Sequence, residues 1–522
     1  MAVITFDTSP DRYRHWTLTV EPPIAILTLV GDGDRDPSFD NELALDPCDL
    51  SVEIELYDAL QRLRFEHPEV GAVILTASPG KGFCTGTHRQ RPARSPHAAP
   101  VSHIAFANET RCAIEDSTAN SGQRWLAALN GTASGGGYDL ALAADEILLV
   151  DDGHSAVSLP GLTTFGVLPG TDALTRLVEK RRVRPDLADV FATLPEGLGG
   201  EQAREWGLVD KVVSPDCFTE VVRERALEAS GSSPRPPASE GVELRPLQRE
   251  EFDGGFAYPD LRVELDGKAQ AATLTLVGPA RLECFAPEPG PRHLRALWWP
   301  LAACRELDDA LLMLRTNWPA LGTLVLRTEG DPLAIAAADV AFLAGYEHDW
   351  FVREVVLYWK RTLKRLELTS HTVIALIEPG SCYVGTLLEL ALAADRAYVL
   401  DSTDPGRPET APAQLVLTGM NFGPLPRSNG LTRLETRFLG RDAHVDLLSK
   451  RVGDPIEAAE AAQLGLVTSA PADRDWNDEV RRVIRERAAL SPSALARLKA
   501  NLHAVGPETL ETKIFGRLTL WI

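Results

Sequence analysis

The chain has 522 residues, which is too long for one ordinary hydrophobic core, so we expect at least two domains. Its 74 Asp and Glu residues outnumber 53 Lys and Arg residues, and the formal net charge is −21. Such an acidic surface argues against nucleic acid or an anionic membrane as the main partner. The composition is otherwise that of a soluble globular protein.

Cysteine usage and the N-terminal residues bear on the compartment. The seven cysteines are scattered, and no two form a CxxC pair, so neither a zinc ribbon nor a disulfide framework is predicted. The first residues lack the basic and apolar regions of a signal peptide. No stretch approaches the ~18 uninterrupted apolar residues of a membrane span. We therefore expect a cytoplasmic protein that neither crosses nor binds a membrane.

Strand and helix patterns alternate along the first half of the chain. The predicted elements are, in chain order, strand 24–31, helix 55–65, strand 71–77, strand 124–131, a helix that three glycines at 135–137 open and that continues to residue 145, and strand 146–152. This alternation is typical of an α/β fold.

The second half repeats the first. Five short matches recur in the same order, between 247 and 258 positions later: LTLVG at 27–31 and 274–278, ELYDAL at 55–60 and ELDDAL at 306–311, LALAAD at 140–145 and 390–395, LTRL at 174–177 and 431–434, and GLV at 207–209 and 465–467. The growing offset predicts a small insertion around residues 401–412. A stretch rich in Ser, Pro and Gly at 229–241 indicates a linker. The predicted domains are therefore 1–228 and 242–522.

Two segments of the first half carry possible chemistry. GKGFCTGTH at 80–88 follows a predicted strand, and NGTASGGGYDLALAAD at 130–145 places three glycines where a strand meets a helix. Helix N-termini offer unpaired amides, and glycine lets a ligand approach them closely. Amides from two such loops would form an oxyanion hole for a thioester carbonyl. The alternative is that the glycines only permit tight packing.

Motifs for other chemistries are absent from the sequence. No GxGxxG opens a helix after a strand, and neither GxxxxGK[ST] nor HExxH occurs. The eleven histidines show no metal-ligand spacing. We therefore expect neither a metal nor a dinucleotide cofactor.

Four motifs in order resemble those of the crotonase (enoyl-CoA hydratase/isomerase) superfamily. They are FCTGT at 83–87, GGGYDLALAAD at 135–145, FGVLPG followed by LTRL at 165–177, and EQAREWGLVDKVV at 201–213. The resemblance implies two tandem crotonase-like domains of ββα spiral type, which arose by internal duplication. It also implies an acyl-CoA or related thioester as substrate, no cofactor beyond the coenzyme A of that substrate, and a homodimer.

Further segments resemble ring-opening lyases with a tandem architecture within this superfamily. They include VEIELYDALQRLRFEHPEVGAVILT, NETRCAIEDS, VSLPGL and EPGSCYVGTLLELALAADR. The implied reaction opens the ring of an epoxidised aromatic CoA thioester with water and releases one carbon as formate. Two alternatives stay open: a diverged enzyme acting on another acyl thioester in a biosynthetic pathway, and a pseudoenzyme that binds acyl-CoA without turnover.

Carried over by motif position, the oxyanion donors are the backbone amides of Thr87 and Gly136. The two positions at which the family carries glutamates hold Asp139 and Gly161 here. Aspartate is shorter than glutamate, and a misplacement of about 1 Å can cost roughly a hundredfold in rate. Gly161 has no side chain to move a proton. Either other groups act as acid and base, or the activity has changed.

Several nearby residues are candidates for these roles. His88, Glu115 and Asp116 could supply acid or base, and Thr163 or Thr164 could orient a water. Lys81, Arg89 and Arg91 could hold CoA phosphates, while Gly135, Gly137 and Gly161 would line the site. For each of the charged side chains, ordinary solvation at the surface is the competing interpretation.

The second copy differs at the same positions. Glu389 stands where the first copy has Asp139, and the three glycines have become Gly385-Thr386-Leu387. The segment corresponding to the oxyanion loop is DPLAIAAAD at 331–339, without the glycine pattern. Leu387 would crowd a ligand. We therefore expect the first half to hold the CoA site and the second half to serve as scaffold and pocket wall.

Overall fold

The computed structural model describes residues 3–30, 50–78, 83–85, 98–165, 173–237, 239–279, 295–402 and 412–517. The chain forms two compact units. The first unit contains residues 7–96, 103–244 and 513–522, and the second contains residues 1–6, 97–102 and 245–512. Each unit holds one copy of the repeated sequence.

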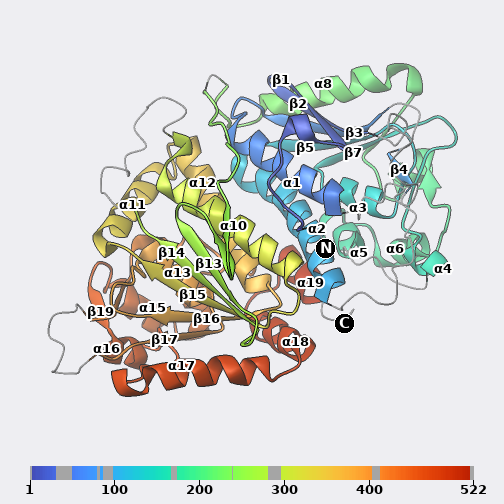
Figure 1. Ribbon diagram of the computed structural model, residues 1–522. Coiled ribbons are helices and arrows are strands. Elements are labelled where there is room, and N and C mark those ends of the chain that lie inside the picture. Colours follow the sequence, from blue (N-terminus) through green and yellow to red (C-terminus); the bar gives the residue numbers. More distant parts are fainter. Residues whose placement is uncertain are drawn as a thin grey trace. The chain divides into compact units, whose positions relative to one another are not determined.

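The first unit is built on a six-stranded sheet in the order β1-β2-β3-β5-β7-β10 (Figure 1). The strands are β1 (Trp16–Glu21), β2 (Ile24–Leu29), β3 (Ala72–Ala77), β5 (Arg124–Leu129), β7 (Glu146–Val150) and β10 (Lys211–Val213). Only β1 runs antiparallel to its neighbour. The four strands predicted from the sequence are confirmed as β2, β3, β5 and β7.

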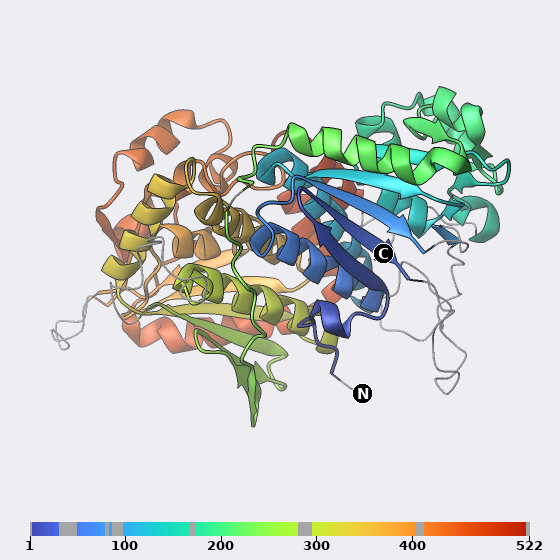
Figure 2. The same ribbon diagram turned by 90° about the horizontal axis from the view of Figure 1, so that it is seen from above.

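Helices cover both faces of this sheet. The helices of the first half are α1 (Leu50–Phe65), α2 (Ala98–Asp116), α3 (Gly136–Leu142), α4 (Gly161–Phe165), α5 (Ala173–Thr175), α6 (Pro185–Ala192), α7 (Gly200–Glu205) and α8 (Phe218–Gly231). Helix α8 packs on one face through Phe218, Val222 and Ala226, whereas α1 and α3 lie on the other (Figures 1 and 2). Strands buried on both faces are apolar along most of their length, as β3 and β7 are.

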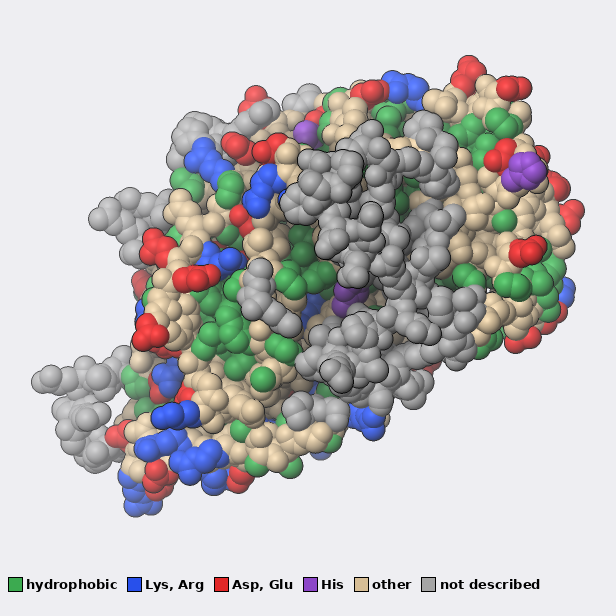
Figure 3. All heavy atoms as spheres, turned by 45° about the vertical axis from the view of Figure 1, so that its right-hand side comes forward, with side chains coloured by type: hydrophobic (Ala, Val, Ile, Leu, Met, Phe, Trp, Pro, Cys, Tyr) green, Lys and Arg blue, Asp and Glu red, His purple; other side chains and the backbone are tan. Residues whose placement is uncertain are grey.

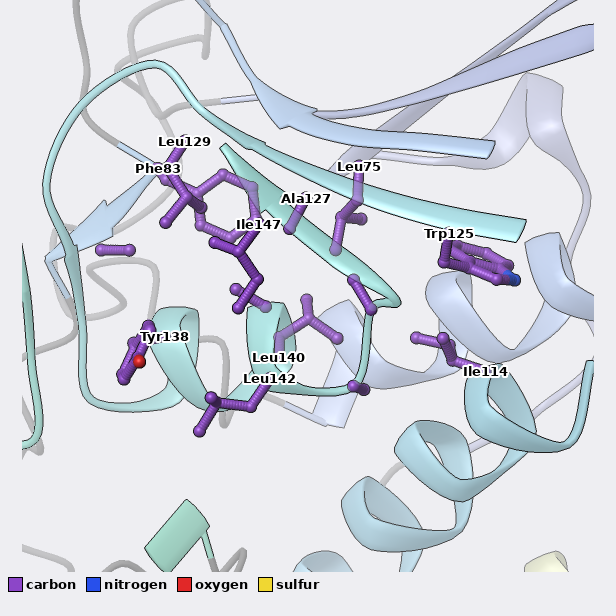
Figure 4. Packing of buried hydrophobic residues seen from close by; sticks show 14 of the residues in the cluster. Leu75, Phe83, Ile114, Trp125, Ala127, Leu129, Tyr138, Leu140, Leu142 and Ile147 are labelled. Carbon is purple, nitrogen blue, oxygen red and sulfur yellow. The ribbon is translucent and has the colours of Figure 1, made fainter. Parts of the chain in front are cut away.

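The larger core cluster lies between the sheet and the helices α1, α2 and α3. Figure 4 shows Phe83, Leu140 and Ile147 gathered between the strands and α3, with Trp125 beside Ile114 of α2. All five side chains are almost fully buried. The cluster therefore fixes helix α3, whose N-terminus carries the three glycines.

A second, four-stranded sheet joins the segments predicted to carry chemistry. Its order is β4-β6-β8-β9, formed by β4 (Cys84–Thr85), β6 (Ala133–Ser134), β8 (Ala156–Ser158) and β9 (Leu198–Gly199). Strands β4 and β8 both run parallel to β6. The ends of these three strands therefore leave the small sheet at the same edge.

The second unit repeats this plan with added antiparallel strands. Its seven-stranded sheet has the order β11 (Glu250–Phe252), β12 (Gly255–Ala257), β13 (Leu261–Asp266), β14 (Ala271–Val277), β15 (Thr323–Glu329), β16 (Thr372–Ile377) and β17 (Arg396–Val399). Strands β14 to β17 are parallel, as β2 to β7 are. Strands β18 (Gln414–Val416) and β19 (Pro455–Glu457) form a small separate sheet.

The second half contributes ten named helices within the described residues. They are α10 (Trp299–Asn317), α11 (Pro332–Gly345), α12 (Trp350–Leu368), α13 (Gly385–Ala393), α14 (Arg433–Arg437), α15 (Asp442–Ser449), α16 (Ala458–Gln463), α17 (Asp473–Ala488), α18 (Pro492–His503) and α19 (Leu510–Arg517). Figure 1 shows α17 and α18 in red below the second sheet. No helix in the described ranges has the length and apolar run needed to cross a bilayer. The α/β class predicted from the sequence is confirmed.

The repeated sequence motifs make repeated contacts. In ELYDAL, Asp58 accepts a hydrogen bond from the Tyr13 hydroxyl at 2.5 Å; in ELDDAL, Asp309 accepts one from the Tyr258 hydroxyl at 2.6 Å. The aspartate of LALAAD accepts from a strand amide in both copies, at 2.8 Å from Trp125 and 2.7 Å from Val373. The duplication is therefore visible in the hydrogen bonds as well as in the amino-acid sequence.

The segment at 229–241, which we expected to be a linker, packs against the first unit. Helix α8 continues to Gly231. The guanidinium of Arg235 is buried and donates to the carbonyl oxygens of Leu63, Arg64, His67 and Pro68. A composition rich in Ser and Pro does not reveal this packing, because a single arginine satisfied by backbone carbonyls provides it. The division between the units falls after Leu244.

Candidate active site

The first half of the site is the start of helix α3. Gly135 has φ 56° and ψ −121°, a conformation that favours glycine, and its amide donates to the Ser158 carbonyl at 2.9 Å. Helix α3 begins at Gly136. No hydrogen bond joins the Gly136 amide to another described residue. This N–H therefore stays available at the positive end of the helix.

Strand β4, at the start of the predicted oxyanion segment, pairs with the strand that leads to this helix. The amide of Phe83 donates to the Thr132 carbonyl at 3.0 Å, and Thr85 pairs with Ser134. Because the pairing is parallel, the chain leaves Thr85 at the same edge as Gly135. The predicted loop residues Lys81, Thr87, His88, Arg89 and Arg91 lie outside the described residues, and their roles stay predictions.

Asp139 lies on the first turn of α3 and is 1% exposed. Its Oδ2 accepts a hydrogen bond from Arg111 Nε, and Arg111 Nη1 also binds Glu53 at 2.8 Å. Its Oδ1 lies 3.9 Å from Arg176 Nη1 and has no hydrogen-bond partner among the described residues. Two guanidinium groups thus hold the carboxylate, and its Oδ1 is in an ion pair with Arg176 without accepting a hydrogen bond from a described residue.

Glu115 binds the other side of Arg176. Its carboxylate lies 3.1 Å from Arg176 Nε and 3.2 Å from Lys180 Nζ. Burial alone would raise the pKa of Glu115, but Arg176 and Lys180 hold it below its ordinary value. Glu115 therefore favours its anionic form and pairs with Arg176, and its catalytic role stays a prediction.

Asp116, the neighbouring candidate, binds different partners. Its carboxylate accepts from Arg64 Nη2 at 3.3 Å and from Asn120 Nδ2 at 2.8 Å. The structure therefore joins Glu115 to Asp139 through Arg176 and gives Asp116 a separate ion pair with helix α1.

Position 161 offers no acid or base. Gly161 is buried at the start of α4, just after Pro160. Thr163 is exposed, and its hydroxyl donates to the Pro160 carbonyl at 3.1 Å, so it caps its own turn. The side chain of Thr164 lies outside the described atoms. Nearby, the Ser158 hydroxyl donates to the Ser134 hydroxyl at 2.8 Å.

The second copy contains the same ionic triad. Arg433 Nη1 binds Glu389 at 2.9 Å, and Arg433 Nε lies 3.1 Å from Glu367. Glu389 differs from Asp139 because both of its oxygens are engaged: Oε1 accepts from Asn421 at 2.6 Å and Oε2 from Arg433. Each oxygen of Glu389 thus accepts a hydrogen bond within the second copy, and its catalytic role stays a prediction.

The helix start of the second copy is occupied by its own side chain. Asp339 Oδ2 accepts from the Thr386 amide at 3.0 Å and from the Thr418 hydroxyl at 2.7 Å. Thr386 stands at the position of Gly136. The segment at 331–339, which we expected to be a degenerate loop, forms the beginning of helix α11, capped by Asp331. Burial raises the pKa of Asp339 to about 7.

Sequence reasoning missed the arginines that organise both sites. Arg176 and Arg433 each stand third in the repeated LTRL motif, so the repeat itself contained the signal. Arg111 and Glu53 carry no such mark, and only the fold shows that Arg111 binds both Asp139 and Glu53. In the described parts of the chain, no cluster of His, Cys, Asp and Glu side chains could hold a metal ion.

Known proteins share sequence similarity with both halves of the chain. The enoyl-CoA hydratase/isomerase family model matches residues 40–236 and 299–521, one segment in each copy. A benzoyl-CoA-dihydrodiol lyase from Aromatoleum evansii is 46% identical over 99% of this chain and 92% of its own length. A carnitinyl-CoA dehydratase from Salmonella typhi is 28% identical over 46% of this chain and 84% of its own.

Among solved structures, an enoyl-CoA hydratase from Geobacillus kaustophilus matches with 27% identity and a TM-score of 0.35, over 42% of this chain and 75% of that chain. The two separate matches of the family model confirm the tandem duplication expected from the repeats. The family predicted from the FCTGT and GGGYDLALAAD motifs is likewise confirmed. The chain belongs to the enoyl-CoA hydratase/isomerase (crotonase) family, with one copy of the family's domain in each half.

Proposed function

We propose that this protein is a crotonase-type lyase that opens an epoxidised aromatic acyl-CoA, of the 2,3-epoxybenzoyl-CoA kind, with water and loss of formate. The full-length similarity to a benzoyl-CoA-dihydrodiol lyase supports the aromatic thioester and the lyase class. The observation that carries the site is the first turn of α3, where neither the Gly136 amide nor Oδ1 of Asp139 has a hydrogen-bond partner among the described residues.

The reaction begins with polarisation of the thioester carbonyl. The Gly136 N–H donates to the carbonyl oxygen, and the amide of Thr87 is its proposed partner in the oxyanion hole. Negative charge that develops on this oxygen is stabilised by the N-terminal end of α3. The polarised carbonyl withdraws electrons from the ring, which makes the epoxide carbons more electrophilic.

Asp139 Oδ1 then transfers a proton between water and the ring. Its side chain is held by Arg111 and Arg176, so it cannot swing away from the site. Gly161 provides no second carboxylate, which disfavours ordinary hydration of a double bond by a carboxylate pair. A strained epoxide is a better fit, because ring strain supplies part of the driving force for attack by water. His88 is the further proposed acid or base, and Lys81, Arg89 and Arg91 are the proposed contacts to CoA phosphates.

The decisive experiment is mass spectrometry of the products formed from enzymatically prepared 2,3-epoxybenzoyl-CoA. We expect formate and a ring-opened CoA aldehyde, and no product from the Gly136→Val variant. Tight binding of the intact thioester without turnover would instead identify an acyl-CoA-binding protein. Turnover of benzoyl-CoA analogues lacking the epoxide would point to another acyl thioester as substrate.

The assembly and location remain part of the proposal. We propose a homodimer in the cytoplasm, because crotonases form oligomers and the seven scattered cysteines fit a reducing compartment. Light scattering of the purified protein tests the dimer, and a monomer at micromolar concentration would contradict it.

A further inference from the structure

The second unit contains a cavity at the end of α13 that lies away from Thr386. Its volume is about 220 Å³, and its wall includes residues 392–395 at the C-terminus of α13 together with parts of α14, α17 and α18. This volume is below the ~300–1,000 Å³ of typical ligand pockets, so a ligand here would be small. None of the residues proposed for catalysis in the first unit lines it.

Cations outnumber anions on the cavity wall. Five of its lining residues are Arg427, Arg433, Arg437, Arg487 and Lys499, whereas the only carboxylates among the lining residues are Glu367 and Asp395. The whole chain carries a net charge of −21, so this excess of positive charge is local. Figure 3 shows one face of the molecule, on which acidic side chains are widespread and several Lys and Arg side chains gather at the lower left.

Both carboxylates of the cavity are already paired. Glu367 lies 2.9 Å from Arg427 and 3.1 Å from Arg433. Asp395 lies 3.3 Å from Lys499, and 3.6 Å from His503. Neither carboxylate makes an ion pair with Arg437 or Arg487, although Asp395 is close enough to Arg487 to raise its pKa.

Arg437 and Arg487 make no ion pair with any described residue. Arg437 donates only to the Gly465 carbonyl, at 2.7 Å. Arg487 Nε is buried and has no hydrogen-bond partner in the described ranges, and the same is true of Nη2 of the fully buried Arg433. Burial lowers the pKa of Arg487, and repulsion from Arg396 lowers it further. Buried guanidinium nitrogens without acceptors are costly, and an anion would satisfy them.

The rest of the wall is apolar. Leu495, Leu498 and Leu502 of α18 line the cavity, and Leu498 and Leu502 are 45% and 63% exposed. An apolar group carried by the ligand would cover these leucines. A bare inorganic ion would satisfy the arginines alone.

We propose that this cavity binds a small organic carboxylate, with its carboxylate between Arg437 and Arg487 and its apolar part against the leucines of α18. Arginine suits this role because its planar fork binds a carboxylate through two parallel hydrogen bonds. The site is independent of the thioester site proposed in the first unit.

Calorimetric titration of the full chain with benzoate, at low ionic strength, tests the proposal. We expect saturable binding that weakens at high salt, and weakens roughly tenfold in Arg487→Gln and in Arg437→Gln, since each removes a charge-assisted contact. Arg481→Gln is the matched control, because Arg481 is an exposed arginine of the same helix. Turnover of the thioester should be the same in all three variants, which separates this site from the proposed catalytic one.

Two further measurements keep the proposal falsifiable. Leu498→Glu places a carboxylate at the cavity wall on a half-exposed position, and it should abolish benzoate binding without lowering the unfolding midpoint. Inorganic phosphate is the second probe and should bind more weakly than benzoate. Benzoate affinity unchanged by both arginine substitutions, or phosphate binding more tightly than benzoate, would overturn the assignment.

Discussion

The two copies of the domain share a buried ionic arrangement, but their carboxylate oxygens differ in whether they accept hydrogen bonds from the protein. In the first, Arg176 joins Glu115 to Asp139; in the second, Arg433 joins Glu367 to Glu389. Asp139 retains an oxygen without a hydrogen bond from any described residue, whereas both oxygens of Glu389 accept one. The copy that carries glutamate at this position is therefore the one in which both carboxylate oxygens accept hydrogen bonds from the protein itself.

The N-termini of α3 and α13 also differ in whether their amides donate to the protein itself. The Gly136 amide has no described partner, but the Thr386 amide donates to Asp339, a carboxylate from the copy's own helix α11. In an oxyanion hole, an amide at this position would instead donate to the negatively charged oxygen of the substrate. The second copy has thus filled the position with a side chain of its own. Duplication has preserved the ionic scaffold in both halves and, in one of them, used the ligand position for packing.

The largest effect should come from blocking the helix start. In Gly136→Val the added side chain prevents the thioester from approaching the amide, so we expect turnover to fall by at least ~10²–10³-fold, the usual cost of losing one oxyanion donor. Thr386→Val makes the corresponding change in the second copy and should leave turnover unaltered. The measurement is product formation per folded molecule, with circular dichroism to confirm folding.

If Thr386→Val abolished turnover while Gly136→Val did not, the second copy would hold the active site and the comparison would reverse. Equal losses in both variants would mean that the two helix starts serve one reaction.

Neutralising the two equivalent carboxylates should separate activity from stability. Asp139→Asn removes the proposed acid/base group, and we expect a loss of about 10²–10⁴-fold in kcat. Glu389→Gln should leave kcat unchanged. Both variants leave a buried arginine with one partner fewer, so both should lose a few kcal/mol of stability, up to about 3–5.

Urea unfolding and steady-state kinetics of the same samples measure both effects. Because the stability losses are expected to be similar, Glu389→Gln controls for unfolding in the kinetic assay of Asp139→Asn. A fall in kcat of the same size in both variants would show that the loss arises from stability and not from proton transfer.

Local patterns predicted the elements that place the site. The apolar runs of β2, β3, β5 and β7 and the glycines before α3 were sufficient, because strands buried on both faces and tight strand-to-helix connections leave strong marks in sequence. The family followed from motifs at the same positions. These patterns therefore predict the course of the backbone around Gly136.

The electrostatic partners could not be predicted in this way. Arg111 reaches Asp139 from another helix, and Asp339 reaches Thr386 across 47 positions of sequence. Neither contact is local, so neither has a spacing that a single sequence reveals. The arginine of the repeated LTRL motif is the exception, since an identical buried charge in two copies predicts a repeated ion pair.

Asp339 should make the second unit sensitive to pH. Its pKa is about 7 in the folded chain, above the ordinary 3.8, so the folded state holds this proton more tightly than the unfolded state. Stability from this group is therefore greatest below about pH 4, falls as the pH rises toward 7, and is level above that. The difference of about three pKa units corresponds to about 4 kcal/mol at most.

Asp339→Asn removes the titration while keeping the shape of the side chain. We expect the variant to lose less stability than the parent protein between about pH 5 and about pH 8 in urea unfolding. Glu306 and Asp260 of the same unit also have raised pKa values, so the parent and the variant must be compared at each pH. Parallel pH profiles would show that Asp339 does not titrate in this range.

The smallest expected effect concerns the tyrosines that both copies retain. Tyr13 donates to Asp58 and Tyr258 donates to Asp309, at nearly the same distance. Tyr13→Phe and Tyr258→Phe each remove one hydrogen bond to a buried carboxyl group, and each should cost about 1–3 kcal/mol without changing kcat. Urea unfolding gives both values. If one variant cost nothing, that tyrosine would be a remnant of the duplication rather than part of the scaffold, and the two copies would share less than their hydrogen bonds suggest.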